Sequence, residues 1–186
     1  MACGRCPATA IFAVAMTPLI SKKVAAALNA QVGMEFLASL QYEAISAWFK
    51  LEGLPRLHAH FSKQAAEERD HAHRFIKYIL DAGIGLEIPA IPAPKCRFKS
   101  AAEAVQLALE HELKVTDSIK DILTLAQKEG DPFTQNFLQW FIKEQLEEVS
   151  SVDELLQIVK RAGDGGLMFV EYYLANKVEE KGGAED

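Results

Sequence analysis

Four long segments of the chain share one pattern, an apolar stripe at helical spacing with a glutamate near its middle. The stripes occupy positions 28, 32, 35, 38, 42, 45, 49; 57, 61, 65, 68, 72, 75, 79; 105, 109, 112, 115, 119, 122, 126; and 138, 141, 145, 148, 152, 155, 159. Such spacing marks the buried face of a helix. The four glutamates are Glu35, Glu68, Glu112 and Glu148. Because glutamate is rarely buried unless it is paired or binds metal, the pattern predicts an all-α bundle with a metal site inside it.

Capping residues, prolines and glycines give the expected helix bounds. The first helix is expected to begin after Thr17-Pro18 and to run to about residue 50, and the second to span about 56–81. The third is expected to begin at the capping box formed by Ser100 and Glu103 and to end near residue 130.

The fourth helix is expected after Asp131-Pro132, which supplies a cap and a first-turn proline, and runs to about residue 161. Asp164 is expected to cap a short fifth helix over 165–178. Residues 83–99 are rich in proline and long enough to cross the whole bundle in extended form. The third helix can therefore run parallel to the second.

The four glutamates are expected to lie at matched heights. Glu35 lies 18 residues before a turn placed at residue 53, and Glu68 lies 15 residues after it. Glu112 and Glu148 each lie 18 residues from a turn placed at residue 130. The largest mismatch, three residues, corresponds to about 4.5 Å of helical rise. Each antiparallel pair can therefore meet in one layer.

His71 follows Glu68 by three residues on the same helical face. Glu68-x-x-His71 is the Glu-x-x-His element of di-iron carboxylate bundles, and iron prefers carboxylate oxygen and imidazole nitrogen. Taken singly, each glutamate could instead reach solvent at a helix edge, and His71 could be an ordinary core histidine. The coincidence of all five residues favours the metal site.

A second acidic group and one tyrosine lie beside these positions. Glu67, Glu144 and Glu147, together with Glu148, form either a solvated charged face or a further, more exposed iron site. Tyr42 lies two turns from Glu35 on the same face. The pattern favours a core tyrosine with a satisfied hydroxyl over a group that hydrogen-bonds a ligand or gives an electron.

Length, charge and hydropathy indicate the number of domains, the kinds of partner and the location of the protein. The 186 residues fit one domain, expected over 19–178, with a disordered extension at 1–18 and an acidic tail at 179–186. A net charge of −6 with no basic face argues against nucleic acid as a partner. The apolar run 8–20 is too short to span a membrane, and a cytoplasmic protein is favoured over one with a signal peptide.

The quoted residues resemble the ferritin family, and the bacterial non-haem ferritins in particular. The stretches that carry the resemblance are Leu28-Asn29 through Glu35, Glu67-Glu68-Arg69-Asp70-His71, His111 through Thr116, and Asn136 through Gln145. The resemblance covers roughly residues 19–178. It implies a ferritin-like four-helix bundle with one long crossover and a short fifth C-terminal helix.

The resemblance also implies a function and a ligand set. The family stores iron after oxidising Fe(II) with dioxygen or hydrogen peroxide, in a shell of 24 subunits whose fourfold axes are lined by the fifth helix. One iron would be held by Glu35, Glu68 and His71. The second would be held by Glu68, Glu112 and Glu148, with Gln145 close by. The third site of the bacterial proteins would fall on Glu67, Glu144, Glu147 and Glu148, and Tyr42 matches the tyrosine beside the centre.

At two positions the sequence differs from the bacterioferritins, and these differences argue against that type of protein. Arg69 stands where bacterioferritins carry the methionine that ligates haem, so no haem is expected. Gln145-x-x-Glu148 replaces their second Glu-x-x-His. Two alternatives stay open: a rubrerythrin-like di-iron peroxidase, for which a second CxxC pair beside Cys3 and Cys6 is lacking, and a non-catalytic helical bundle.

Overall fold

A computed structural model describes residues 17–182 of the chain. Most of the expected N-terminal extension, 1–16, and the end of the acidic tail, 183–186, lie outside the described residues. The helices are α1 (Lys22–Leu51), α2 (Pro55–Asp81), α3 (Ala101–Lys128), α4 (Pro132–Ala162), the 3-10 helix η1 (Asp164–Gly166) and α5 (Leu167–Gly182). Over this range there is no strand, and no helix is long and apolar enough to cross a membrane.

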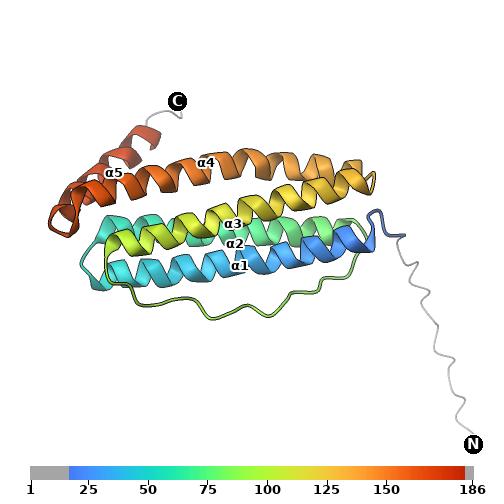
Figure 1. Cartoon of the computed structure of the whole chain (residues 1–186), viewed down its shortest axis with the longest axis horizontal. Coiled ribbons are helices and arrows are strands. Elements are labelled where there is room, and N and C mark those ends of the chain that lie inside the picture. The colour runs from blue at the N-terminus through green and yellow to red at the C-terminus, as the bar shows by residue number, and fades with distance from the viewer. Residues whose placement is uncertain (1–16, 183–186) are drawn as a thin grey trace, which may run out of the picture.

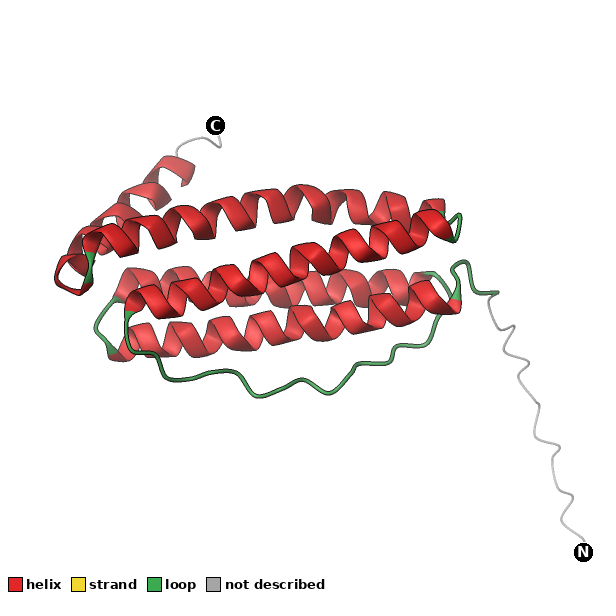
Figure 2. Ribbon diagram, in the orientation of Figure 1, coloured by secondary structure: helices red, strands yellow, loops and turns green. Residues whose placement is uncertain are grey.

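The helices form a four-helix bundle of two antiparallel hairpins, α1–α2 and α3–α4 (Figure 1). The connection from α2 to α3 runs without regular structure along the whole length of the bundle (Figure 2). As a result α2 and α3 run in the same direction, and α5 lies at one end against α2 and α4. The all-α bundle with one long crossover and a short fifth helix is confirmed.

The core consists of two apolar clusters with the glutamates between them. One cluster contains Ile45, Phe49 and Phe61 and extends to α5, and the other contains Leu28, Val32 and Phe75 at the opposite end. Every position of the four predicted stripes is buried. The helical spacing therefore predicted the register of all four long helices correctly.

The start of the first helix differs from the expectation. α1 begins at Lys22, and the side chain of Ser21 caps it by accepting a hydrogen bond from the Val24 amide. The predicted cap Thr17-Pro18 lies outside the helix. The Leu19 amide donates to the Ala82 carbonyl at the end of α2, 3.0 Å away, and this bond keeps the preceding segment out of α1.

The other expected caps form with one variation. Asp131 accepts from the Thr134 amide, and Ser100 accepts from the Glu103 amide. In a reciprocal capping box the glutamate would accept from the amide of the serine. Here Glu103 accepts instead from the amide of Lys99, one residue earlier, at 2.5 Å.

The beginning of α5 was also predicted incorrectly. Asp164 lies inside η1 rather than capping α5, and α5 extends to Gly182, into the segment expected as a tail. A residue of α5 instead caps another helix. The carboxylate of Glu171 accepts from the amides of Arg56 at 2.7 Å and Leu57 at 2.9 Å, at the start of α2. The N-cap residue of α2, Leu54, has no side-chain acceptor of its own.

The crossover is held along one face of α1. The Asn29 side-chain oxygen accepts from the Glu87 amide, and the Gln41 amide exchanges two hydrogen bonds with the backbone of Lys95. Between these two points Pro89 packs directly on Gly33, where an added Cβ would lie 2.4 Å from Pro89 Cγ.

Candidate metal centre

The predicted ligands meet in the middle of the bundle and are removed from solvent. Glu35 and Glu68 are fully buried, and Glu112, His71 and Glu148 are 1%, 4% and 7% exposed. Glu35 comes from α1, Glu112 from α3 and Glu148 from α4, while α2 supplies Glu68 and His71. A buried cluster of four carboxylates and one imidazole is costly unless a cation neutralises it.

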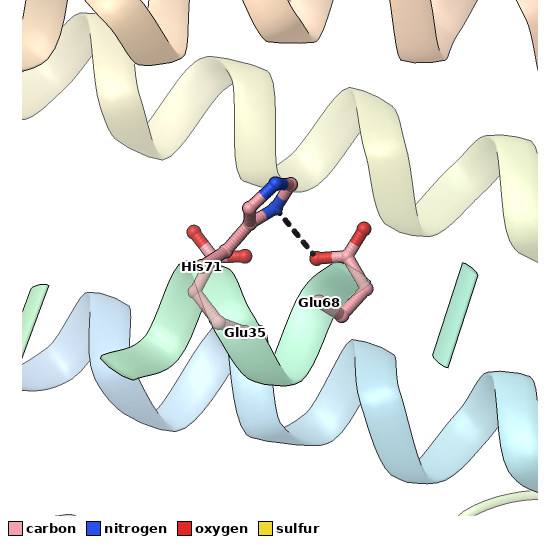
Figure 3. A group of neighbouring side chains, drawn as sticks. All are labelled: Glu35, Glu68 and His71. Carbon is pink, nitrogen blue, oxygen red and sulfur yellow. Dashed lines mark ion pairs between the residues drawn. The ribbon is translucent and has the colours of Figure 1, made fainter. Parts of the chain in front are cut away.

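The ligand atoms form three overlapping groups, in each of which they lie within 4.8 Å of one another. The first contains Glu35, Glu68 and His71, and the second contains Glu68, Glu112 and Glu148. Figure 3 shows Glu68 and His71 on the same side of α2, with Glu35 beside them. His71 Nδ1 lies 3.4 Å from Glu68 Oε2. Because Glu68 belongs to both groups, it lies where one carboxylate could bridge two metal ions.

The third ligand group includes two residues of the predicted second acidic group, Glu144 and Glu148. It contains His71, Glu144 and Glu148. Glu67 instead pairs with Lys63 at 3.0 Å, and Glu147 is exposed. The structure thus brings Glu144 and Glu148 together with His71 and places neither Glu67 nor Glu147 in such a group.

Burial and like charge govern the electrostatics of the centre. Burial, and next the neighbouring Glu68 carboxylate, raise the pKa of Glu35 well above its ordinary value. Burial is also the main cause of the raised pKa of Glu68, Glu112 and Glu148. Both oxygens of Glu68 and one of Glu35 are buried without a hydrogen-bond donor among the described residues. Carboxylates left in this state suit a bound cation.

Tyr42 lies directly against the centre. Its hydroxyl donates a short hydrogen bond to Glu112 Oε1, and burial together with this carboxylate raises the pKa of Tyr42. Gln145 contacts the centre as a donor. Its Nε2 donates to Glu148 Oε2 at 2.6 Å, while its Oε1 accepts from the Thr116 hydroxyl. In this orientation the amide oxygen, the only atom that could ligate a metal, is turned toward α3.

Sequence reasoning missed three residues around the ligands. Gln31 is fully buried and donates to Glu35, and Ser118 and Thr116 hydrogen-bond to the side chains of Gln31 and Gln145. Gln31 lies four residues before Glu35 on the same face, a spacing at which side chains interact. That spacing could have identified Gln31, but no helical pattern within one segment links it to Ser118.

The arrangement can bind two cations side by side. Each of the first two groups offers three ligands of the oxygen and nitrogen types that iron prefers, and the surrounding apolar clusters limit access of water. A carboxylate shared by the two groups would hold two metal ions next to each other, as in two-metal sites.

The sequence matches a known protein family and several of its members. Residues 25–162 match the family model described as "Ferritin-like domain". The chain is 39% identical to "Ferritin BfrB" of Mycolicibacterium smegmatis over 88% of this chain and 90% of that protein. It is 36% identical to "Bacterial non-heme ferritin" of Staphylococcus haemolyticus, over 78% of this chain and 88% of the relative.

A relative named "Bacterioferritin BfrB", from Mycobacterium tuberculosis, is 38% identical over 84% of this chain and 86% of its own length. Among solved structures, an open pore ferritin from the archaeon Archaeoglobus fulgidus superposes with a TM-score of 0.81. It is 29% identical and covers 85% of this chain and 98% of its own.

Proposed function

This chain belongs to the ferritin family, and from that premise we propose that it stores iron by binding Fe(II), oxidising it and holding Fe(III) as a mineral inside a shell of identical subunits. The observation that carries the proposal is the pair of buried ligand groups that share Glu68. Two such sites in one bundle suit an oxidation that needs two metal ions at once.

Each residue of the centre has a role in this function. Glu35, Glu68 and His71 bind one Fe(II), and Glu68, Glu112 and Glu148 bind the other. The carboxylates supply negative charge as the ions go from Fe(II) to Fe(III). Each Fe(II) loses one electron, so two ions reduce one dioxygen to hydrogen peroxide with uptake of two protons. Tyr42 holds Glu112 in place through the hydrogen bond that its hydroxyl donates.

Finer features of the proposal rest on the family resemblance. The chain would be of the non-haem type because Arg69 offers no haem ligand, and its shell would contain 24 subunits in the cytoplasm. A third iron would bind beside the pair, for which the group of His71, Glu144 and Glu148 gives partial support. Glu67 and Glu147 remain predicted ligands that would have to move toward this group.

Anaerobic titration with Fe(II) tests the proposal. We expect at least two ions per chain, and rapid oxidation on addition of dioxygen. Glu68→Ala should lower the initial oxidation rate about 10- to 100-fold or more, because both ions lose a ligand. Glu43→Ala, which removes an exposed carboxylate from α1, should leave the rate unchanged. Binding of fewer than two ions, or an unchanged rate in Glu68→Ala, contradicts the proposal.

A further inference from the structure

The two carboxylate oxygens of Glu35 have different surroundings. Oε1 accepts from Gln31 Nε2 at 2.8 Å, while Oε2 is buried with no hydrogen-bond donor among the described residues. Gln31 is itself fully buried, so its amide oxygen also needs a partner. The hydroxyl of Ser118 on α3 supplies it, with Oγ 2.5 Å from Gln31 Oε1.

The carboxylate and the serine together determine which end of the glutamine faces Glu35. A hydroxyl that donates to the amide oxygen leaves the amide NH2 group pointing the other way, at Glu35. If the amide were flipped, its oxygen would face a carboxylate oxygen and its NH2 group would face Ser118. The carboxylate can only accept and so requires the NH2 group, while the Ser118 hydroxyl completes this orientation by donating to the amide oxygen. Gln31 thus holds one oxygen of Glu35, and the other oxygen has no donor among the described residues.

The same arrangement occurs on the opposite side of α3. Thr116 Oγ1 donates to Gln145 Oε1 at 2.6 Å, and Gln145 Nε2 donates to Glu148 Oε2, also at 2.6 Å. The other oxygen of Glu148, Oε1, lies 3.9 Å from His71 Nδ1 and so faces the ligand group. Two residues along a helix correspond to about 200° around its axis. Thr116 can therefore hydrogen-bond to a side chain of α4, while Ser118 hydrogen-bonds to a side chain of α1.

We propose that Ser118 and Thr116 are positioning residues for two separate iron sites. Each hydroxyl fixes a glutamine amide, and each amide fixes one oxygen of a ligand carboxylate so that the second oxygen is presented to Fe(II). Ser118 acts through Gln31 on the site of Glu35, and Thr116 acts through Gln145 on the site of Glu148. The inference rests on the proposed function, because it assumes that these carboxylates bind Fe(II).

Site-selective loss of affinity is the expected result. In anaerobic calorimetric titrations with Fe(II), Ser118→Ala should weaken binding of one ion about 10- to 100-fold, and Thr116→Val should weaken binding of the other by a similar factor. Near-infrared circular dichroism of the bound Fe(II) should change in different bands for the two variants. The conservative variants Ser118→Thr and Thr116→Ser keep a hydroxyl and should retain the wild-type affinities.

Ser39→Ala is the matched control. Ser39 is a buried serine one turn beyond Glu35, and its hydroxyl donates to the Ala65 carbonyl at 2.7 Å, not to a side chain of the centre. Its loss should lower the melting temperature and leave both Fe(II) affinities unchanged. If Ser118→Ala and Thr116→Val weaken both ions equally, or neither, the positioning roles are wrong while two-ion binding by the wild type still supports the function. A wild type that binds fewer than two ions defeats the proposed function itself.

Discussion

Glu68 destabilises the metal-free fold for the same reasons that make it suitable as a metal ligand. It is fully buried, neither of its oxygens has a hydrogen-bond donor among the described residues, and it belongs to two ligand groups. A protein without metal must hold this carboxylate either as the neutral acid or as an uncompensated charge. A cation bound at this position would remove the penalty, so the features that disfavour the metal-free fold are those that would favour metal binding.

The raised pKa of the buried glutamates predicts how the metal-free protein responds to pH. A carboxyl group whose pKa is higher in the folded than in the unfolded state stabilises the fold below its ordinary pKa, near 4.5. That contribution is lost as pH rises through the folded value. With chelator present, we therefore expect the free energy of unfolding to fall from pH 5 to pH 8.

Glu148→Gln isolates one of these groups. The amide cannot ionise, so the variant should lose stability less steeply with pH, by up to about 1.4 kcal/mol per pH unit. Denaturant unfolding at four pH values measures the slope. Glu52→Gln, which changes an exposed residue at the end of α1, should reproduce the wild-type slope. Equal slopes for Glu148→Gln and the wild type would show that Glu148 does not carry the penalty.

The positions of the buried glutamates could be predicted from the sequence, whereas the hydroxyl groups that hydrogen-bond to the neighbouring glutamines could not. Glu35, Glu68, Glu112 and Glu148 each interrupt a regular stripe, and the register of a helix follows from that stripe alone. The contact between Ser118 and Gln31 joins α3 to α1, so it depends on how two helices are rotated against each other. Such rotation is set by packing and leaves no period in either segment.

At the level of elements, α1 supports the crossover and also supplies Glu35, one of the proposed ligands. Asn29, Gly33 and Gln41 contact the crossover from one face of α1, while Glu35 points from another into the bundle. The proline-rich composition of 83–99 predicted an extended connection. It did not predict the docking, because side-chain amides such as Gln41 can pair with any nearby backbone.

The close approach of Pro89 to Gly33 gives a prediction for this contact. Gly33→Ala places a methyl group 2.4 Å from Pro89 Cγ, and such overpacking typically costs about 1–3 kcal/mol. It should exceed the gain of about 1 kcal/mol expected for alanine over glycine inside a helix. We therefore expect Gly33→Ala to lower the free energy of unfolding, as measured with denaturant.

A double variant separates the clash from other effects of the same substitution. Pro89→Ala removes the Cγ and Cδ atoms, so in that background Gly33→Ala should be neutral or stabilising. If Gly33→Ala costs the same in both backgrounds, contact with Pro89 is not the cause.

Helix ends show the limits of local signals in the same way. Asp131 and Ser100 cap the helices that they precede, as their positions predicted. Thr17-Pro18 has an equally good local pattern, but the bond from Leu19 to Ala82 holds that segment against α2. Glu171 caps α2 from α5, a contact over more than a hundred residues of chain that no local motif can encode.

At the level of the whole molecule, α5 presents an exposed apolar surface that is suited to assembly. Met168, Phe169 and Tyr172 are 72%, 78% and 70% exposed and lie on neighbouring turns. Large apolar side chains gathered on a surface mark sites of interaction. In the shell that we propose, this face of α5 would be covered by copies of the same helix.

Phe169→Ser combined with Tyr172→Ser should therefore reduce the mass of the assembly. Size-exclusion chromatography with light scattering would give the mass, and circular dichroism would establish that the subunit stays helical. The substitutions leave Glu171 and its bonds to α2 in place, so the bundle should still fold. An assembly of unchanged mass would mean that α5 is not required for subunit association.

One short stretch of α3 makes three contacts with other helices, and this limits the insertions and deletions that the stretch can tolerate. Glu112, Thr116 and Ser118 lie within seven positions, and their side chains contact two helices: Glu112 and Ser118 contact α1, and Thr116 contacts α4. Inserting or deleting one residue between Glu112 and Thr116 would rotate the rest of α3 by about 100° relative to Glu112 and separate both hydroxyls from their glutamines. Changes of length should therefore be rare in this stretch among natural relatives and tolerated mainly in the turns. A designer who grafts this centre onto another bundle would have to transfer these seven residues as one block.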